Sequence, residues 1–256
     1  MLYLRSALFL AWFLVVSIIM NVGAVPTLVM PRAFVLAAAK TWADLVLFGL
    51  KWIAGTRVDV RGTLPSRRVL VASKHFSMWE TIALLTLLPS PAIVMKRSLL
   101  RVPLYGWYCW KMGMIAIDRE AGASALRGMA EDAKRVLKEN RPIVIFPEGT
   151  RKKRGAPPDY KPGVAGLYAQ LRVPCVPAAH NSGLFWAGAF LRKPGTIVLE
   201  LLEPIPAGLP RREFMRELES RIEGAATRLL GEGELKPASP SRAEGEASRR
   251  HTEEAL

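Results

Sequence analysis

The chain has 256 residues, of which 50% are hydrophobic, and it carries a net charge of +14 at neutral pH. This length fits one compact domain with appendages. Only two cysteines occur, Cys109 and Cys175, which excludes a disulfide framework and a cysteine-based metal cluster and favours a reducing compartment.

The first predicted element is a strongly apolar N-terminal region. Residues 7–20, "ALFLAWFLVVSIIM", contain one polar residue and no charge. Residues 33–54 continue the apolar character with three charges, Lys40, Asp44 and Lys51. At 100° per residue these charges fall within about 40° on a helix, so they form one narrow polar stripe. We predict a membrane-associated helical hairpin over residues 1–54 that dips into one leaflet.

Two alternatives for the N-terminus stay open. The first apolar stretch could be a true span, although it is short for a hydrocarbon core about 30 Å thick. It could also be a secretory signal cleaved after Ala24, since Val22 and Ala24 are acceptable small residues. A single preceding arginine, Arg5, and the second apolar stretch argue against a cleaved leader.

The charge is concentrated in the body of the protein. Before Gly231 there are 32 basic and 16 acidic residues, a net charge of +16. Such a body suits an anionic surface, either nucleic acid or the cytoplasmic leaflet of a membrane. Beside the apolar N-terminus, the simpler prediction is the inner membrane with the body facing the cytoplasm. The alternative is a membrane-tethered nucleic-acid-binding protein. Such a protein would need a platform of aromatic and basic residues, which this sequence does not show.

From about residue 55 the pattern changes to short β-branched runs that alternate with helical stretches. This alternation predicts an α/β domain over residues 55–230, with a mixed, largely parallel sheet flanked by helices. The tail, residues 231–256, has few large apolar residues and is predicted to be disordered. Strands are expected at 68–72, 92–96, 114–117, 142–146, 173–179 and 196–202, and helices near 79–88, 103–112, 122–139, 161–171 and 211–230.

The segment "KHFSMWET", residues 74–81, places His75 five residues before Glu80. Ser77 and Glu80 fit a helix capping box, which would make the carboxylate local scaffolding. The same geometry suits chemistry, because helical side chains lean toward the helix N-terminus and would bring Glu80 toward the imidazole. The two residues are therefore candidates for a catalytic pair, with the capping box as the alternative.

Other chemically useful side chains follow predicted strands. In an open α/β sheet, ligands collect where strands end and loops begin. Each such residue also has an ordinary interpretation, as a solvated lysine, a bridged Asp–Arg pair or a turn. The residues are Lys96 after "AIVM", Asp118 and Arg119 after "MIAI", and Glu148, Gly149, Thr150 and Arg151 in "FPEGTR".

Four ordered blocks resemble those of the lysophospholipid acyltransferase family. They are "KHFSMWE", the pattern K-x-x-L-x-x-V-P-x-x-G followed by "IDR", "FPEGTR", and "VPCVPAAHNSG". Together they cover roughly residues 60 to 205, and the N-terminal hairpin is also similar to the membrane-binding part of the family. Two positions depart from the usual pattern: Glu80 stands where aspartate is common, and Phe76 where a polar residue is common.

The resemblance implies transfer of a fatty acyl group from an acyl thioester to the free hydroxyl of 1-acylglycerol 3-phosphate, giving phosphatidic acid. His75 would be the general base and Glu80 would orient its ring. Ser77 as a nucleophile is less favoured, because no G-x-S-x-G surrounds it. The resemblance also assigns phosphate binding to Lys96, Arg119 and Arg151, and shaping of the pocket to Glu148 and Gly149, with Thr150 as a further substrate-binding residue.

The remaining expectations concern partners. The donor would be acyl-CoA or an acyl carrier protein, and no metal or redox cofactor is expected. His180 is interpreted as a packed histidine, and Pro177 as support for the acyl groove. Two alternatives keep the acyl chemistry but change the acceptor: another lysolipid, such as lyso-ornithine lipid, or water, as in a thioesterase.

Overall fold

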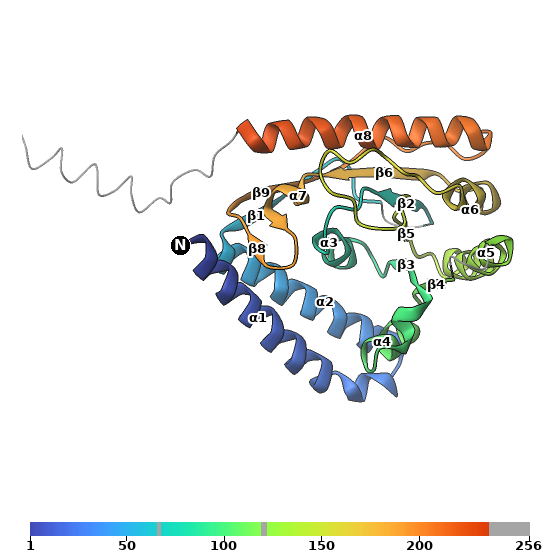
Figure 1. The fold of residues 1–256 in the computed structure, drawn as a ribbon. Helices are drawn as coiled ribbons and strands as arrows, with labels where there is room; N and C mark the ends of the chain where they lie inside the picture. Colours follow the sequence, from blue (N-terminus) through green and yellow to red (C-terminus); the bar gives the residue numbers. More distant parts are fainter. Residues whose placement is uncertain (66–67, 119–121, 236–256) are drawn as a thin grey trace, which may run out of the picture.

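A seven-stranded sheet with helices on both faces forms the body of the protein, and two long N-terminal helices lie along one side of it (Figure 1). The computed structural model describes residues 1–65, 68–118 and 122–235. The sheet order is β1-β9-β6-β2-β5-β3-β4. Every neighbouring pair is parallel except β6 and β9, which confirms the predicted mixed, largely parallel α/β fold.

All six predicted strands are present with small shifts at their ends, and three strands were missed: β1 of the main sheet and the two short strands of a separate hairpin. The missed strand of the main sheet, β1, is an edge strand with three exposed positions, so its sequence, "TRVDVR", lacks the apolar run that marked the buried strands. The strands of the main sheet are β1 Thr56–Arg61, β2 Leu70–Ser73, β3 Ala92–Lys96, β4 Ile115–Ile117, β5 Ile143–Ile145, β6 Cys175–His180 and β9 Gly195–Leu201. A separate two-stranded hairpin joins β7 Trp186–Ala187 and β8 Leu191–Arg192.

The five predicted helices of the body are also present. They are α3 Trp79–Leu87, α4 Tyr105–Met112, α5 Gly122–Lys138, α6 Gly163–Leu171 and α8 Arg211–Leu235. Two short helices were not predicted, η3 Arg97–Arg101 and α7 Ser182–Phe185. Helix α8 continues to Leu235, so the first five residues of the predicted tail are helical, and residues 236–256 lie outside the described residues.

Alternation along the central strands builds a core on each face of the sheet. Leu70 of β2 and Ile143 of β5 face a core that includes residues of α5, α6 and α8, such as Phe214. Their neighbours Val71 and Val144 face the opposite core, which α3 and the N-terminal helices cover. Successive side chains of a β-strand point to opposite faces of the sheet, so both faces of these central strands are buried.

The N-terminal hairpin consists of α1 Leu2–Gly23, a short turn of helix η1 Val25–Leu28, α2 Arg32–Gly49 and the π-helical segment η2 Leu50–Ala54. Helices Leu2–Gly23 and Arg32–Ala54 are long and apolar enough to cross a membrane, with mean hydropathies of 2.1 and 1.6. Only 17% of the apolar window of α1 is buried, unlike the core helix of a soluble protein.

The predicted polar stripe of α2 attaches the hairpin to the body. Lys40 Nζ donates to the Leu88 carbonyl at 2.9 Å and the Thr86 carbonyl at 3.4 Å, and Asp44 accepts a hydrogen bond from the Thr86 hydroxyl. A cation at the C-terminal end of α3 also satisfies helix carbonyls that have no partner within the helix. Lys40 and Asp44 therefore face α3, whereas Lys51, the third charge of the predicted stripe, is exposed in η2 and lies over the Trp52 ring.

Candidate active site

The carboxyl ends of β2, β3, β4, β5 and β6 lie on one edge of the sheet, because these five strands run parallel. His75 follows β2 and Lys96 ends β3. Glu148 follows β5 and His180 ends β6. Residues that are far apart in sequence thus meet at the edge where open α/β sheets bind ligands.

His75 and Glu80 form a hydrogen-bonded pair. The His75 Nδ1 and Glu80 Oε1 atoms lie 2.8 Å apart, and the two side chains are 13% and 0% exposed. A carboxylate on Nδ1 fixes the tautomer that carries its proton there and leaves Nε2 free to accept one. The spacing of five residues brings the pair together because His75 lies just before α3 and Glu80 lies in its first turn.

Glu80 makes the reciprocal bond of the predicted capping box and is the partner of His75 at once, although the N-cap position of α3 is Met78, one residue after Ser77. Its Oε1 also accepts the Ser77 N–H at 2.8 Å, while its Oε2 accepts the Ser77 and Ser182 hydroxyls at 2.7 and 3.2 Å. Burial alone raises the pKa of Glu80. The His180 imidazole and the hydrogen bonds from His75 and Ser77 outweigh burial and hold the pKa at about 2. The carboxylate is therefore ionised at neutral pH, and the two interpretations of this segment are compatible.

The imidazole of His75 is held in place from several sides. Its ring stacks on Phe146, which follows β5, with centroids 4.1 Å apart and planes inclined by 18°. The His75 N–H donates to Glu148 Oε2 at 3.3 Å, and its carbonyl accepts the Lys152 N–H at 2.9 Å. These contacts fix both backbone and ring. The sequence carried no signal for the stacking on Phe146, which depends on the pairing of β2 with β5.

A buried ion cluster lies behind His75. Lys74 Nζ contacts Glu148 Oε1 at 2.8 Å and Glu223 Oε1 at 2.7 Å, and Lys74 and Glu148 are 2% and 0% exposed. The Tyr160 hydroxyl donates to Glu223 at 2.9 Å. Burial raises the pKa of Glu148, and the lysine opposes this. Sequence reasoning missed Lys74 and Glu223, since Glu223 lies 149 residues away on α8.

Replacing Lys74 with methionine should leave the buried Glu148 carboxylate without its cation. Breaking a buried ion pair from one side costs about 3–5 kcal/mol, so we expect the free energy of unfolding to fall by that amount in urea titrations in detergent. Lys134→Met removes an exposed lysine of α5 and should change stability by less than about 0.5 kcal/mol. Equal stability of Lys74→Met and the wild type would mean that the cluster has no net effect on folding.

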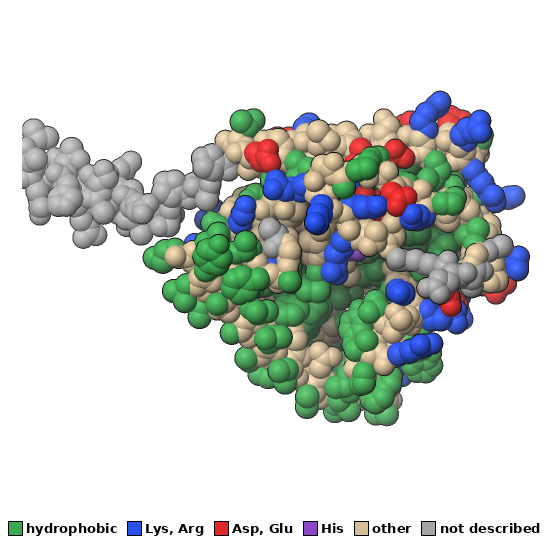
Figure 2. Space-filling view, in the orientation of Figure 1, with side chains coloured by type: hydrophobic (Ala, Val, Ile, Leu, Met, Phe, Trp, Pro, Cys, Tyr) green, Lys and Arg blue, Asp and Glu red, His purple; other side chains and the backbone are tan. Residues whose placement is uncertain are grey.

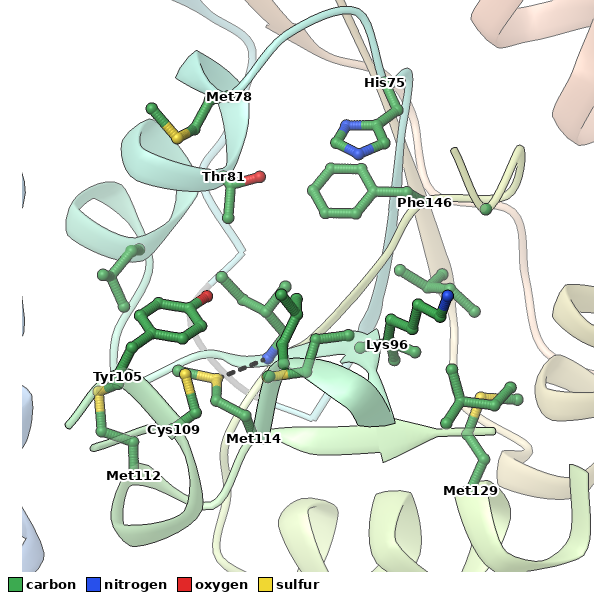
Figure 3. Close-up of a pocket in the computed structure, with 18 of the residues that line it drawn as sticks. His75, Met78, Thr81, Lys96, Tyr105, Cys109, Met112, Met114, Met129 and Phe146 are labelled. Carbon is green, nitrogen blue, oxygen red and sulfur yellow. Dashed lines mark hydrogen bonds between the residues drawn. The ribbon is translucent and has the colours of Figure 1, made fainter. Parts of the chain in front are cut away.

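An elongated apolar cavity of about 890 Å³ opens beside His75. Figure 3 shows His75 and Phe146 at one end and Cys109, Met112 and Met114 at the other. Residues of α1, α2, α3, α4 and β3 contribute to its walls. The volume lies within the range of ligand-binding sites that enclose an apolar molecule.

The predicted binding residues fall into three groups. Lys96, Gly149 and Arg151 line the cavity with His75. Glu148 is buried behind His75 in the ion cluster, and Thr150 is exposed and contributes no wall of the cavity. Arg119 lies outside the described residues. Lys96 and Arg151 are both exposed at the cavity, and neither has an ion-pair partner within the part of the chain that the structure describes.

His180 and Ser77 have structural partners. His180 is fully buried, its Nε2 donates to the Lys74 carbonyl at 2.9 Å, and burial lowers its pKa. The Ser77 hydroxyl donates to Glu80 and accepts the Trp79 N–H at 3.0 Å. Neither side chain lines the cavity, which favours packing for His180 and capping for Ser77. Among residues 1–65, 68–118 and 122–235, no three His, Cys, Asp or Glu side chains are grouped as metal ligands.

Comparisons with known proteins agree with this geometry. A family model described as "Acyltransferase" matches residues 57–181. The chain is 32% identical over 196 residues to a 1-acyl-sn-glycerol-3-phosphate acyltransferase of Pseudomonas aeruginosa, covering 75% of this chain and 76% of that protein. It is 35% identical over 142 residues to the human 1-acyl-sn-glycerol-3-phosphate acyltransferase alpha, covering 54% of this chain and 50% of that protein.

The fold resembles a solved structure over nearly its whole length. The crystal structure of the 1-acyl-sn-glycerophosphate (LPA) acyltransferase PlsC from Thermotoga maritima superposes with a TM-score of 0.72, covering 90% of this chain and 99% of that chain. Sequence identity between the two is 20%, so the likeness concerns the fold.

Proposed function

This chain belongs to the acyltransferase family, and on that premise we propose that it moves a fatty acyl group from a thioester to the free hydroxyl of 1-acylglycerol 3-phosphate, giving phosphatidic acid. The observation that carries the proposal is the bond between His75 Nδ1 and the buried Glu80 carboxylate at the wall of an apolar cavity. The names of the relatives supply the acceptor.

In the proposed reaction, His75 Nε2 takes the proton of the acceptor hydroxyl as that oxygen attacks the thioester carbonyl carbon. A new C–O ester bond forms, the C–S bond breaks, and the proton passes from the imidazolium to the leaving thiolate. Glu80 stabilises the imidazolium in between and stays ionised. The chain supplies this step with its own side chains, so the proposal includes no cofactor, and the thioester is that of acyl-CoA or an acyl carrier protein.

The two parts of the lipid fit two parts of the site. Lys96 and Arg151 present positive charge on the cavity wall, where a phosphate monoester would bind by charge-assisted hydrogen bonds. The apolar remainder of the cavity suits acyl chains. We assign phosphate contact to Lys96 and Arg151 and leave Glu148 as the residue that holds Lys74 and the His75 backbone.

The decisive experiment is an assay of the purified chain in detergent with an acyl thioester and several lysolipids, with the products identified by mass spectrometry. We expect phosphatidic acid from 1-acylglycerol 3-phosphate. Product from lyso-ornithine lipid alone would overturn the acceptor but keep the chemistry. Release of free fatty acid without any lipid product would identify a thioesterase instead.

Arg151→Ala should raise the apparent KM for 1-acylglycerol 3-phosphate roughly 10- to 100-fold, because a charge-assisted hydrogen bond contributes about 1.5–3 kcal/mol. The KM for the thioester should move much less. Arg151→Lys should recover only part of the loss, since lysine lacks the planar fork of donors. Arg216→Ala, which removes an exposed arginine of α8, is the matched control. An unchanged lysolipid KM in Arg151→Ala would remove this residue from the phosphate site.

We also propose that the hairpin holds the enzyme at the cytoplasmic face of the inner membrane. The exposed apolar surface of α1 and the excess of positive charge in the body support this. Packing of α1 onto the body argues against a cleaved leader, because Phe9 is buried and the Ser6 hydroxyl accepts the Arg192 N–H at 3.0 Å. Mass spectrometry of the membrane-bound protein should find residues 1–24 present, and a mature chain without them would contradict the hairpin.

A further inference from the structure

Helix α4 exposes two large aromatic side chains to solvent. Trp107 and Trp110 are 55% and 73% exposed, whereas Tyr108, Cys109 and Met112 of the same helix are buried. Residues three apart lie on the same side of a helix, so the two indoles form one outward face. An exposed pair of tryptophans next to further exposed apolar residues is unusual for a surface in contact with water alone.

This face is continuous with the apolar surface of the hairpin. Trp107 and Trp110 border a shallow depression together with Leu28 of η1, and α4 packs against both η1 and α2. Val29, just beyond η1, is 90% exposed. In Figure 2, hydrophobic side chains gather over the hairpin and the neighbouring lower part of this face, while charged side chains gather over the rest.

The charge around α4 matches an anionic lipid surface. Residues 81–117 contain no acidic residue and four basic ones, Lys96, Arg97, Arg101 and Lys111. Arg97 and Arg101 are exposed at the two ends of η3, which leads into α4. Tryptophan prefers the boundary between lipid headgroups and acyl chains, and basic residues prefer anionic headgroups. The combination favours a bilayer over a protein partner.

We propose that α4 is a second lipid-contacting element, which inserts Trp107 and Trp110 into the headgroup region of an anionic bilayer beside the hairpin. The inference rests on the proposed function, since it concerns how the lipid site meets its membrane. The opposite face of α4 supplies Tyr105, Tyr108, Cys109 and Met112 to the cavity wall. One short helix therefore separates the bilayer from the cavity and holds the cavity close to the source of its lipids.

A fluorescent probe tests the contact directly. The full chain carrying Trp110→Cys is labelled with an environment-sensitive dye and placed in vesicles of phosphatidylcholine and phosphatidylglycerol that contain spin-labelled lipid. Both native cysteines are buried, and labelled wild type measures the background. We expect quenching by the spin-labelled lipid at position 110 and at Ile18→Cys on α1. We expect none at Val58→Cys on β1, at the opposite edge of the sheet from β4.

Each outcome bears on a separate claim. Quenching at position 18 but not at 110 overturns the role of α4 and leaves the membrane hairpin standing. Quenching at neither position contradicts both, while acyltransferase activity in micelles remains an independent test of the proposed function.

Kinetics give a second measurement that does not depend on labelling. Trp107→Ala/Trp110→Ala should lower kcat/KM for lysolipid presented in anionic vesicles by about tenfold or more, because exposed aromatic area no longer enters the lipid. Activity in detergent micelles should stay near that of the wild type, since neither indole lines the cavity. Val58→Ala/Leu64→Ala, which truncates two exposed apolar side chains of the body, is the control. Equal losses in vesicles and micelles would point to a damaged fold and overturn the proposal.

Discussion

Replacing His75 with alanine should lower kcat by roughly 10²–10⁴-fold, the range that general base catalysis contributes. The reason is that no other described side chain takes the same place, bonded to the buried Glu80 carboxylate at 2.8 Å and stacked on Phe146 at the cavity wall. The measurement is turnover of acyl thioester with saturating 1-acylglycerol 3-phosphate in detergent micelles.

The same variant should fold normally. His75 is partly exposed and its ring nitrogen has one polar partner, so its removal leaves Glu80 with three other donors from Ser77 and Ser182. Circular dichroism and the unfolding midpoint should therefore match the wild type. A near-normal turnover in a folded His75→Ala protein would reduce the pair to a helix cap.

Replacing Glu80 with glutamine should lower both the turnover and the stability of the protein, whereas His75→Ala should lower the turnover alone. The neutral amide removes the charge that stabilises the imidazolium and presents an NH₂ group to donors that need an acceptor. We expect turnover to fall by about 10²-fold or more. Glu80→Asp should retain part of the activity, because it keeps the charge and shortens the side chain by one methylene.

The pH dependence of unfolding gives the Glu80 prediction a second test. The folded-state pKa is lowered from 4.5 to about 2, so the ionised carboxylate stabilises the folded state. This stabilisation, on the order of 3 kcal/mol at 1.36 kcal/mol per pKa unit, is fully present above about pH 4.5 and is lost as the pH falls toward 2. Glu80→Gln should be less stable at neutral pH and should lose less stability on acidification. Parallel acid-unfolding curves for the two proteins would contradict the assignment.

The sequence predicted those parts of the site that follow from local rules. His75 and Glu80 meet because one precedes and the other begins α3, and Lys96 and Arg151 reach the cavity because parallel strands end on one edge. Local rules could not find the cluster of Lys74 with Glu223, which exists only because α8 crosses the sheet. They also missed β1, which has three exposed residues in succession and pairs with β9 from far along the chain. The Lys74–Glu223 ion pair and the β1–β9 strand pairing both depend on tertiary packing, which cannot be predicted from the residue pattern of a single segment.

The short helix α3 holds Glu80 at one end and attaches the N-terminal hairpin at the other. Glu80 lies in the first turn of α3. At the other end of the helix, Lys40 of α2 donates to the Leu88 carbonyl, and Asp44 of α2 accepts a hydrogen bond from the Thr86 hydroxyl. At 1.5 Å per residue, this nine-residue rod is about 13 Å long. It fixes the distance of the His75–Glu80 pair from the hairpin and the orientation of Glu80 around the helix axis. Inserting one residue into α3 would turn Glu80 by about 100° relative to Lys40, so the hairpin and the imidazole could not both keep their partners. Changes in the length of this helix should therefore be far less tolerated than changes in its exposed side chains.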